Sequence, residues 1–293
     1  MLALLALLLL LPGCIVRRRQ PLPEATAAPL WRTATLEELL DNVQAQQEAI
    51  QTINATVELE PSVRYPQRGE IVHYRDVRAF LLIRKPAFIR MIGQYPVVRN
   101  TAFDMASDGN RFGLYIPSKN RFIIGDSAGK GHSESALENL RPQHILDALL
   151  IHGPTESEQA ALEAFNNGQR AYYVVHVLQP DGGGGLLLDR NLWFERQDLS
   201  LERLQIFGEG GEIVTDVSYS NYGEFGGISY PQQIVMDRPQ DKYGLRLTVT
   251  RLVFNEPLGD EKFLLERPTG TELVDLEEQT DEEDLSGGEE GVG

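Results

Sequence analysis

The chain has 293 residues, with 27 Lys and Arg against 43 Asp and Glu, and a formal net charge of −16 at pH 7. Phosphates repel such a surface, so the composition argues against nucleic-acid binding. A single cysteine excludes an internal disulfide framework. The length allows one large all-β domain or two smaller domains.

The N-terminal residues, MLALLALLLLLPG, form an apolar run that ends in Pro and Gly. A helix needs about 20 apolar residues to span a bilayer, so this run is too short. It fits the apolar region of a secretory signal peptide, although the usual preceding basic residues are missing. We therefore predict that residues 1–13 are a signal peptide.

Cys14 follows this run directly, and Leu-Pro-Gly-Cys resembles a bacterial lipobox, whose cysteine is acylated and becomes the mature N-terminus. An exported chain with one cysteine has no partner thiol, which favours lipid attachment at Cys14. Two or three acyl chains hold a protein durably on a membrane. The alternative is a soluble secretory signal with an incidental cysteine. In enteric bacteria, an Asp directly after the acylated cysteine retains a lipoprotein at the inner membrane. This chain has Ile15 at that position, so we expect its anchor to lie in the periplasmic face of the outer membrane.

Both ends of the expected mature chain have the composition of unfolded segments. Residues 14–34 contain an arginine cluster and several prolines, which predicts an extended, lipidated tether. Its arginines are suited to anionic headgroups. Residues 277–293 carry eight acids and no base, and this predicts a disordered tail. The folded domain is therefore expected over residues 35–276.

The domain is predicted to begin with a helix from Thr35 to about Ile53. Thr35 and Glu38 have the spacing of a capping box, and apolar residues then recur at helical spacing. About five short β-branched and aromatic runs follow, separated by turn residues such as Asp108-Gly109.

A helical insert is predicted near residues 135–167. It contains a leucine-rich stripe, then a second capping-box pattern from Thr155 to Glu158, and Gly168 is placed to end that helix. About six further strands follow, and the DGGGG sequence at 181–185 is expected to be a hairpin loop between two of them.

This order of elements predicts an α+β protein with about 11 antiparallel strands and its helices grouped on one side. A sheet of that size must curl or close. If it curls only partway, its concave face needs a cover, and the helices are the available material. An apolar face under helices is a cavity for an apolar ligand.

We find no sequence pattern that indicates an enzyme, a metal site or a cofactor. The five histidines have no metal-ligand spacing, and the GxSxG sequence of a hydrolase nucleophile is absent. Large apolar residues in the predicted strands are the candidates for a ligand cavity, and an ordinary packed core is the alternative reading of each. The candidates are Phe80, Leu82, Phe88, Met91, Phe103, Met105, Phe112, Phe122, Trp193 and Phe194, with Leu146, Leu149 and Leu150 from the insert.

Four short motifs follow a known pattern of strands and turns: Arg84-Lys85-Pro86, Ser107-Asp108-Gly109, Tyr115-Ile116-Pro117, and the segment from Lys262-Phe263 to Gly270. In this order they resemble the LolA/LolB superfamily of bacterial lipoprotein carriers. The resemblance implies an incomplete, strongly curved antiparallel β-barrel, with a helical lid over a hydrophobic cavity. The cavity would hold acyl chains of lipoproteins or lipids in transit to the outer membrane.

The soluble carrier of this family has an arginine before the motif's proline, which helps to hold its lid shut. Lys85 stands there in this chain, and lysine does not make the same forked contacts. Lys85 is therefore a candidate lid contact. Leu146, Leu149 and Leu150 are the candidate lid surface, since the sequence His152-Gly153-Pro154 after them has the character of a hinge.

The sequence thus favours a membrane-anchored, non-enzymatic carrier or acceptor whose partners are lipoprotein acyl chains or lipids and the membrane itself. Two alternatives use the same elements: an envelope-stress sensor that signals through another envelope protein, and a structural envelope lipoprotein with a packed core. A lipid hydrolase is disfavoured because no nucleophile motif is present.

Overall fold

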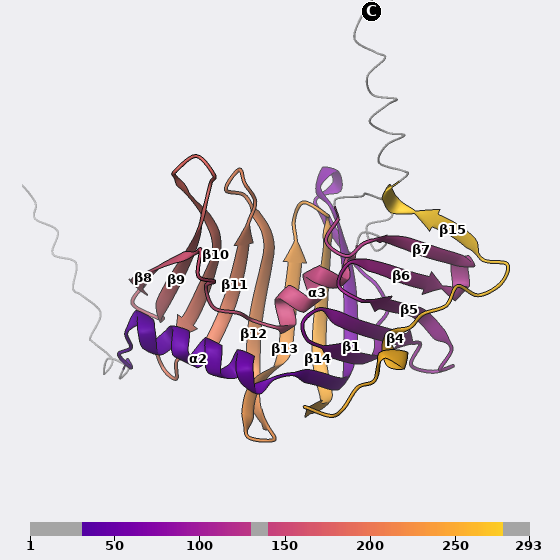
Figure 1. The fold of residues 1–293 in the computed structure, drawn as a ribbon, viewed down its shortest axis with the longest axis horizontal. Coiled ribbons are helices and arrows are strands. Elements are labelled where there is room, and N and C mark those ends of the chain that lie inside the picture. The colour runs from indigo at the N-terminus through magenta and orange to yellow at the C-terminus, as the bar shows by residue number, and fades with distance from the viewer. Residues whose placement is uncertain (1–30, 130–139, 278–293) are drawn as a thin grey trace, which may run out of the picture. The chain divides into compact units, whose positions relative to one another are not determined.

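The computed structural model describes residues 31–129 and 140–277 (Figure 1). The predicted signal peptide, Cys14, the tether up to residue 30 and the tail from residue 278 lie outside the described residues. The described residues from Arg32 onward belong to one compact unit.

One mostly antiparallel sheet contains all 15 strands of the described residues. Its order is β15-β7-β6-β5-β4-β3-β1-β14-β13-β12-β11-β10-β9-β8, and β2 pairs with β1 outside this path. The sheet is not closed into a barrel, because β15 and β8 are its two ends. Among these strands, only β15 and β7 pair in parallel. The strands are β1 (Thr52–Tyr65), β2 (Glu70–His73), β3 (Val77–Arg84), β4 (Phe88–Gln94), β5 (Thr101–Ser107), β6 (Arg111–Ile116), β7 (Arg121–Asp126), β8 (Gln159–Asn166), β9 (Ala171–Pro180), β10 (Leu186–Glu195), β11 (Leu201–Phe207), β12 (Ile213–Phe225), β13 (Ile228–Arg238), β14 (Tyr243–Phe254) and β15 (Glu272–Asp275).

The sheet has more strands than the 11 expected from sequence, and β2, β7, β8 and β15 account for the difference. Residues 71–83 read as a single strand-like run in the sequence, but the connection at Tyr74–Asp76 divides them between β2 and β3. β15 has only four residues, too few for a clear alternating pattern. The hairpin predictions are confirmed: Asp108-Gly109 joins β5 to β6, and residues 181–185 join β9 to β10.

Helix α2 (Leu36–Ala49) begins as its sequence predicts. The Thr35 hydroxyl accepts a hydrogen bond from the Glu38 backbone N–H (3.2 Å), and the Glu38 carboxylate accepts one from the Thr35 N–H (2.7 Å). The expected end at Ile53 is wrong, because Ile50 is already extended and Ile53 pairs within the sheet. α2 crosses the strands from β9 to β13 (Figure 1).

The predicted insert is helical only in α3 (Pro142–Leu149), and residues 130–139 lie outside the described residues. The second predicted helix is wrong, since Gln159–Asn166 forms strand β8 and pairs with β9. Glu158 does accept the Thr155 N–H as in a capping box (2.7 Å). Pairing with β9 then overrides the local helical preference. Gly168, with φ +86°, lies in the β8–β9 turn.

The two faces of the sheet have different covers. Both helices share one hydrophobic core with alternate strand residues, for example Ala79, Leu81 and Ile83 of β3, and we call this side the helix face. The segment 256–271 crosses the far face over β3 and β4. There the Arg84 and Arg90 guanidinium groups donate to the backbone carbonyls of Leu258 (2.8 Å) and Leu264 (2.7 Å).

Candidate functional site: an apolar cavity

A cavity of about 560 Å³ lies on the helix face. It is bordered by β1, β3 to β6 and β14, and this volume is within the usual range of small-molecule sites. The lining residues are Leu59, Pro61, Tyr74, Arg75, Val77, Met91, Tyr95, Ala102, Phe103, Met105, Leu114, Ile116, Lys119, Leu140, Tyr243, Gly244 and Leu245.

The cavity wall is apolar where three neighbouring strands meet. Met91, Met105 and Leu114 are cross-strand partners on β4, β5 and β6, so the sheet register places them side by side. Both methionines are 0 % exposed. Thioether side chains are flexible, and such a wall adapts to ligands of different shape.

A glycine makes room for one aromatic wall of the cavity. Phe103 on β5 is paired with Gly93 on β4, and its ring lies over the glycine. A Cβ atom added at Gly93 would lie only 2.8 Å from Phe103 Cζ. The missing side chain therefore allows this ring position.

Polar side chains lie at the exposed part of the lining. Tyr74 and Arg75 come from the β2–β3 connection, and Lys119 ends the short helix η3 (Pro117–Lys119). All three are exposed, whereas the methionine wall is fully buried. The site is thus amphipathic, with an apolar interior and a polar rim.

Three solved structures have folds similar to this chain. A DUF1329 family protein from Desulfovibrio piger has a TM-score of 0.52 at 13% identity, covering 79% of this chain and 98% of that chain. An outer membrane lipoprotein-sorting protein domain from Vibrio parahaemolyticus has a TM-score of 0.51 at 14% identity, covering 77% of this chain and 94% of that chain. A LolA superfamily protein from Nitrosomonas europaea has a TM-score of 0.51 at 12% identity, covering 80% of this chain and 99% of that chain. The chain has a LolA-like fold. Neither a family model nor a curated protein sequence matches it.

Within this LolA-like fold, three of the predicted cavity residues line the cavity: Met91, Phe103 and Met105. Phe112 and Phe194 also face the helices but are packed into the core, each 3 % exposed. The rim residues Arg75 and Lys119 were not predicted from the sequence, because they belong to connections rather than to alternating strands.

The remaining strand candidates lie on the far face. Leu82 shares that face with Phe80, which is 38 % exposed, because β3 buries the alternate residues against the helices. Phe88 packs on Phe263, with ring centroids 5.5 Å apart. Phe122 lies over Gly113, and Trp193 packs edge-on against Phe165 and Tyr172. The aromatic content of a strand does not reveal on which face of the sheet a given side chain lies, since a shift of one residue in the strand register moves it to the opposite face.

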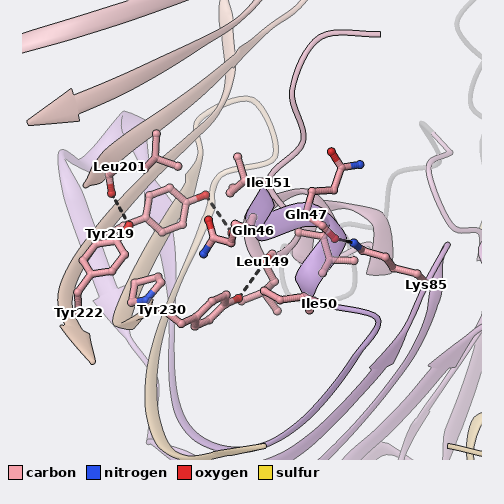
Figure 2. A pocket seen from close by; sticks show the side chains of 13 residues that line it. Gln46, Gln47, Ile50, Lys85, Leu149, Ile151, Leu201, Tyr219, Tyr222 and Tyr230 are labelled. Carbon is pink, nitrogen blue, oxygen red and sulfur yellow. Dashed lines mark hydrogen bonds between the residues drawn. The ribbon is translucent and has the colours of Figure 1, made fainter. Parts of the chain in front are cut away.

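The candidate lid residues on α3 are held against the sheet. Leu146 and Leu149 are buried in the core, whereas Leu150 is only partly buried. The Tyr219 hydroxyl donates to the Ala148 carbonyl (2.9 Å), and the Tyr230 hydroxyl donates to the Leu149 carbonyl (2.8 Å), as Figure 2 shows. These bonds satisfy carbonyls that a helix C-terminus leaves without partners. Opening of α3 as a lid stays a prediction.

Lys85 is hydrogen-bonded to α2, and it lines a small pocket together with Leu149 of α3 (Figure 2). Its Nζ donates to the backbone carbonyl of Gln47 in the last turn of the helix (Figure 2). A cation is favoured there by the helix dipole. Partial burial lowers the pKa of Lys85, and nearby Glu48 opposes this shift.

A neutral histidine contacts a residue of the cavity lining without lining the cavity itself. His144 Nδ1 lies 2.7 Å from the hydroxyl of Tyr243, a lining residue. Burial, with the charges of Arg238 and Arg141, holds the pKa of His144 well below its usual range. The imidazole is therefore uncharged at pH 7, and the contact with Tyr243 is structural.

The described residues contain neither a metal site nor a membrane-spanning helix. No three His, Cys, Asp or Glu side chains in residues 31–129 and 140–277 are grouped to hold a metal ion. Neither α2 nor α3 has the length and apolar character that a membrane span requires.

Proposed function

We propose that this protein is a membrane-anchored, non-enzymatic carrier or acceptor of acyl chains. It binds the acyl chains of lipoproteins or lipids during their transfer to the outer membrane, from the periplasmic face of that membrane. The observation that carries the proposal is the cavity, whose buried wall of Met91, Met105 and Leu114 offers no polar group to a ligand. An acyl chain has the matching chemistry.

The fold comparison supports the same conclusion. One of the similar structures is described as an outer membrane lipoprotein-sorting protein domain. Acylation at Cys14 provides the anchor in this proposal, and the segment up to residue 34 provides the tether. The acidic tail, residues 277–293, is a solvated end.

An exposed apolar loop next to the cavity supports membrane contact. The β4–β5 connection carries Val97 and Val98, which are 92 % and 63 % exposed. Tyr95, in the same connection, lines the cavity. Adjacent exposed valines are costly in water but are favourable at a lipid surface. In this proposal the loop brings the rim of the cavity to the membrane.

Binding of a neutral lipopeptide tests the proposal. A synthetic N-palmitoyl peptide with a fluorophore should bind the domain, and Ala102→Trp, which fills the cavity, should weaken that binding about tenfold. Ala161→Trp is the matched control, because Ala161 is exposed on β8 at the other end of the sheet. Absence of binding to the wild-type domain, or equal effects of the two variants, would contradict an acyl-binding cavity.

A further inference from the structure

The cavity is free of acidic side chains in a chain that is strongly acidic. The chain has a net charge of −16, yet the cavity lining, as the structure describes it, includes no Asp or Glu. Its only charged members there are Arg75 and Lys119. The charged side chains of the described lining are therefore opposite in sign to the net charge of the whole molecule.

Both cations are on the rim. Arg75 lies in the β2–β3 connection and Lys119 at the end of η3, and each is exposed. The methionine wall beyond them is 0 % exposed. An amphiphile entering this cavity lowers its free energy by burying its tail and leaving its headgroup at the rim.

Arg75 is available to such a headgroup. It forms no ion pair with any residue that the structure describes. Its neighbour Asp76 is exposed and does not line the cavity. A guanidinium group matches the paired oxygens of a carboxylate or a phosphate, and a lysine ammonium adds a second positive charge.

We propose that the cavity selects acyl ligands with an anionic group at the end that stays on the rim. The group is the carboxylate of a fatty acid or the phosphate of a phospholipid. Arg75 and Lys119 recognise it, and the apolar wall takes the chain. This inference rests on the proposed function and narrows its ligand class.

Matched pairs of ligands test the selection. Oleate and oleyl alcohol share one chain and differ in charge; lysophosphatidylglycerol and lysophosphatidylcholine differ in net headgroup charge. Each ligand, below its micellar concentration, displaces the neutral fluorescent lipopeptide. We expect the anionic member to bind about fivefold more tightly at low salt. The difference should shrink between about 0.01 M and about 1 M salt because the rim is exposed.

The variant Arg75→Gln/Lys119→Gln should reduce this ratio to about one and leave oleyl alcohol binding unchanged. Arg78→Gln is the control, because Arg78 is an exposed cation of β3 that does not line the cavity. Selection of oleate alone assigns a carboxylate ligand, and selection of the anionic lysolipid alone assigns a phosphate headgroup that has no compensating cation such as choline. Equal binding within both pairs overturns this inference and leaves the carrier function standing. Failure of the lipopeptide itself to bind overturns the carrier function.

Discussion

Arg190 and Glu158 are joined by two hydrogen bonds, from Nη1 to Oε1 at 2.7 Å and from Nη2 to Oε2 at 3.1 Å. Arg190 Nη2 also donates to the Gly153 carbonyl at 2.9 Å. The Arg190 side chain is 6 % exposed and that of Glu158 is 11 % exposed. This pair ties the α3–β8 connection, where a hinge was expected, to strand β10.

Removing the guanidinium should destabilise the fold strongly. We expect Arg190→Met to lower the free energy of unfolding by about 3–5 kcal/mol, since Glu158 and Asp189 lose their shared partner in a buried setting. Urea denaturation followed by circular dichroism measures the change. Arg170→Met is the control: Arg170 is 59 % exposed in its pair with Glu202, so we expect a loss below about 1 kcal/mol. Equal losses of unfolding free energy in the two variants would show that the buried pair contributes no more to stability than the exposed pair.

The same pair gives a pH dependence of known sign. Hydrogen bonds from Arg190 lower the pKa of Glu158 from 4.5 to about 2. Because the folded-state pKa is the lower one, this stabilisation is complete above about pH 4.5 and is lost as the pH falls towards 2. Its size is on the order of 3 kcal/mol.

Comparison with Glu158→Gln isolates this contribution from that of other carboxylates. The wild-type protein should exceed the variant in unfolding free energy at pH 7, and the gap should narrow steadily as the pH falls from 4.5 towards 2. A gap that stays constant over this interval would show that Glu158 is not held by its charge.

Glu158 also shows what the sequence could predict and what it could not. The Thr155–Glu158 bond is local, and the sequence predicted it, as it did the capping box of α2. The strand after Glu158 depends on pairing with β9, which follows β8 after a short turn, and the capping-box pattern before Gln159 does not reveal that pairing. Sequence reasoning placed Met91 and Met105 in a cavity, but it could not assign Phe80 to a face, because the sheet register decides that.

Removing the two tyrosine hydroxyls that bond to α3 should lower the free energy of unfolding without changing the packing of the rings. We expect Tyr219→Phe and Tyr230→Phe each to cost about 1–3 kcal/mol, because each leaves a buried helix carbonyl unsatisfied. Tyr115→Phe is the matched control, since the Tyr115 hydroxyl has no hydrogen-bond partner among the described residues, and its effect should stay within about 0.5 kcal/mol. Thermal melts of the three variants decide whether these bonds hold α3.

Substitution of Cys14 tests whether the chain carries a lipid anchor. Cys14→Ser removes the only thiol of the chain. If Cys14 is acylated, the variant should move from the membrane fraction to the soluble fraction of cells, because acyl chains supply the durable anchor. Mass spectrometry of the wild-type N-terminus is the companion measurement. Unchanged membrane association of the variant would contradict acylation at Cys14.

Gly93 and Phe103 offer a way to change the cavity from a position that is not in its lining. A Cβ atom at Gly93 would lie 2.8 Å from Phe103 Cζ, so Gly93→Ala must displace the ring. The ring lines the cavity, and we expect its displacement to narrow the space and to weaken lipopeptide binding about tenfold. Stability should change little, because alanine reduces the entropy of the unfolded chain and the neighbour that must move is a side chain. The double variant Gly93→Ala/Phe103→Ala removes the displaced ring and should restore binding. Unchanged binding in Gly93→Ala would mean that the ring turns away from the cavity, and weak binding in both variants would mean that the strand itself has shifted.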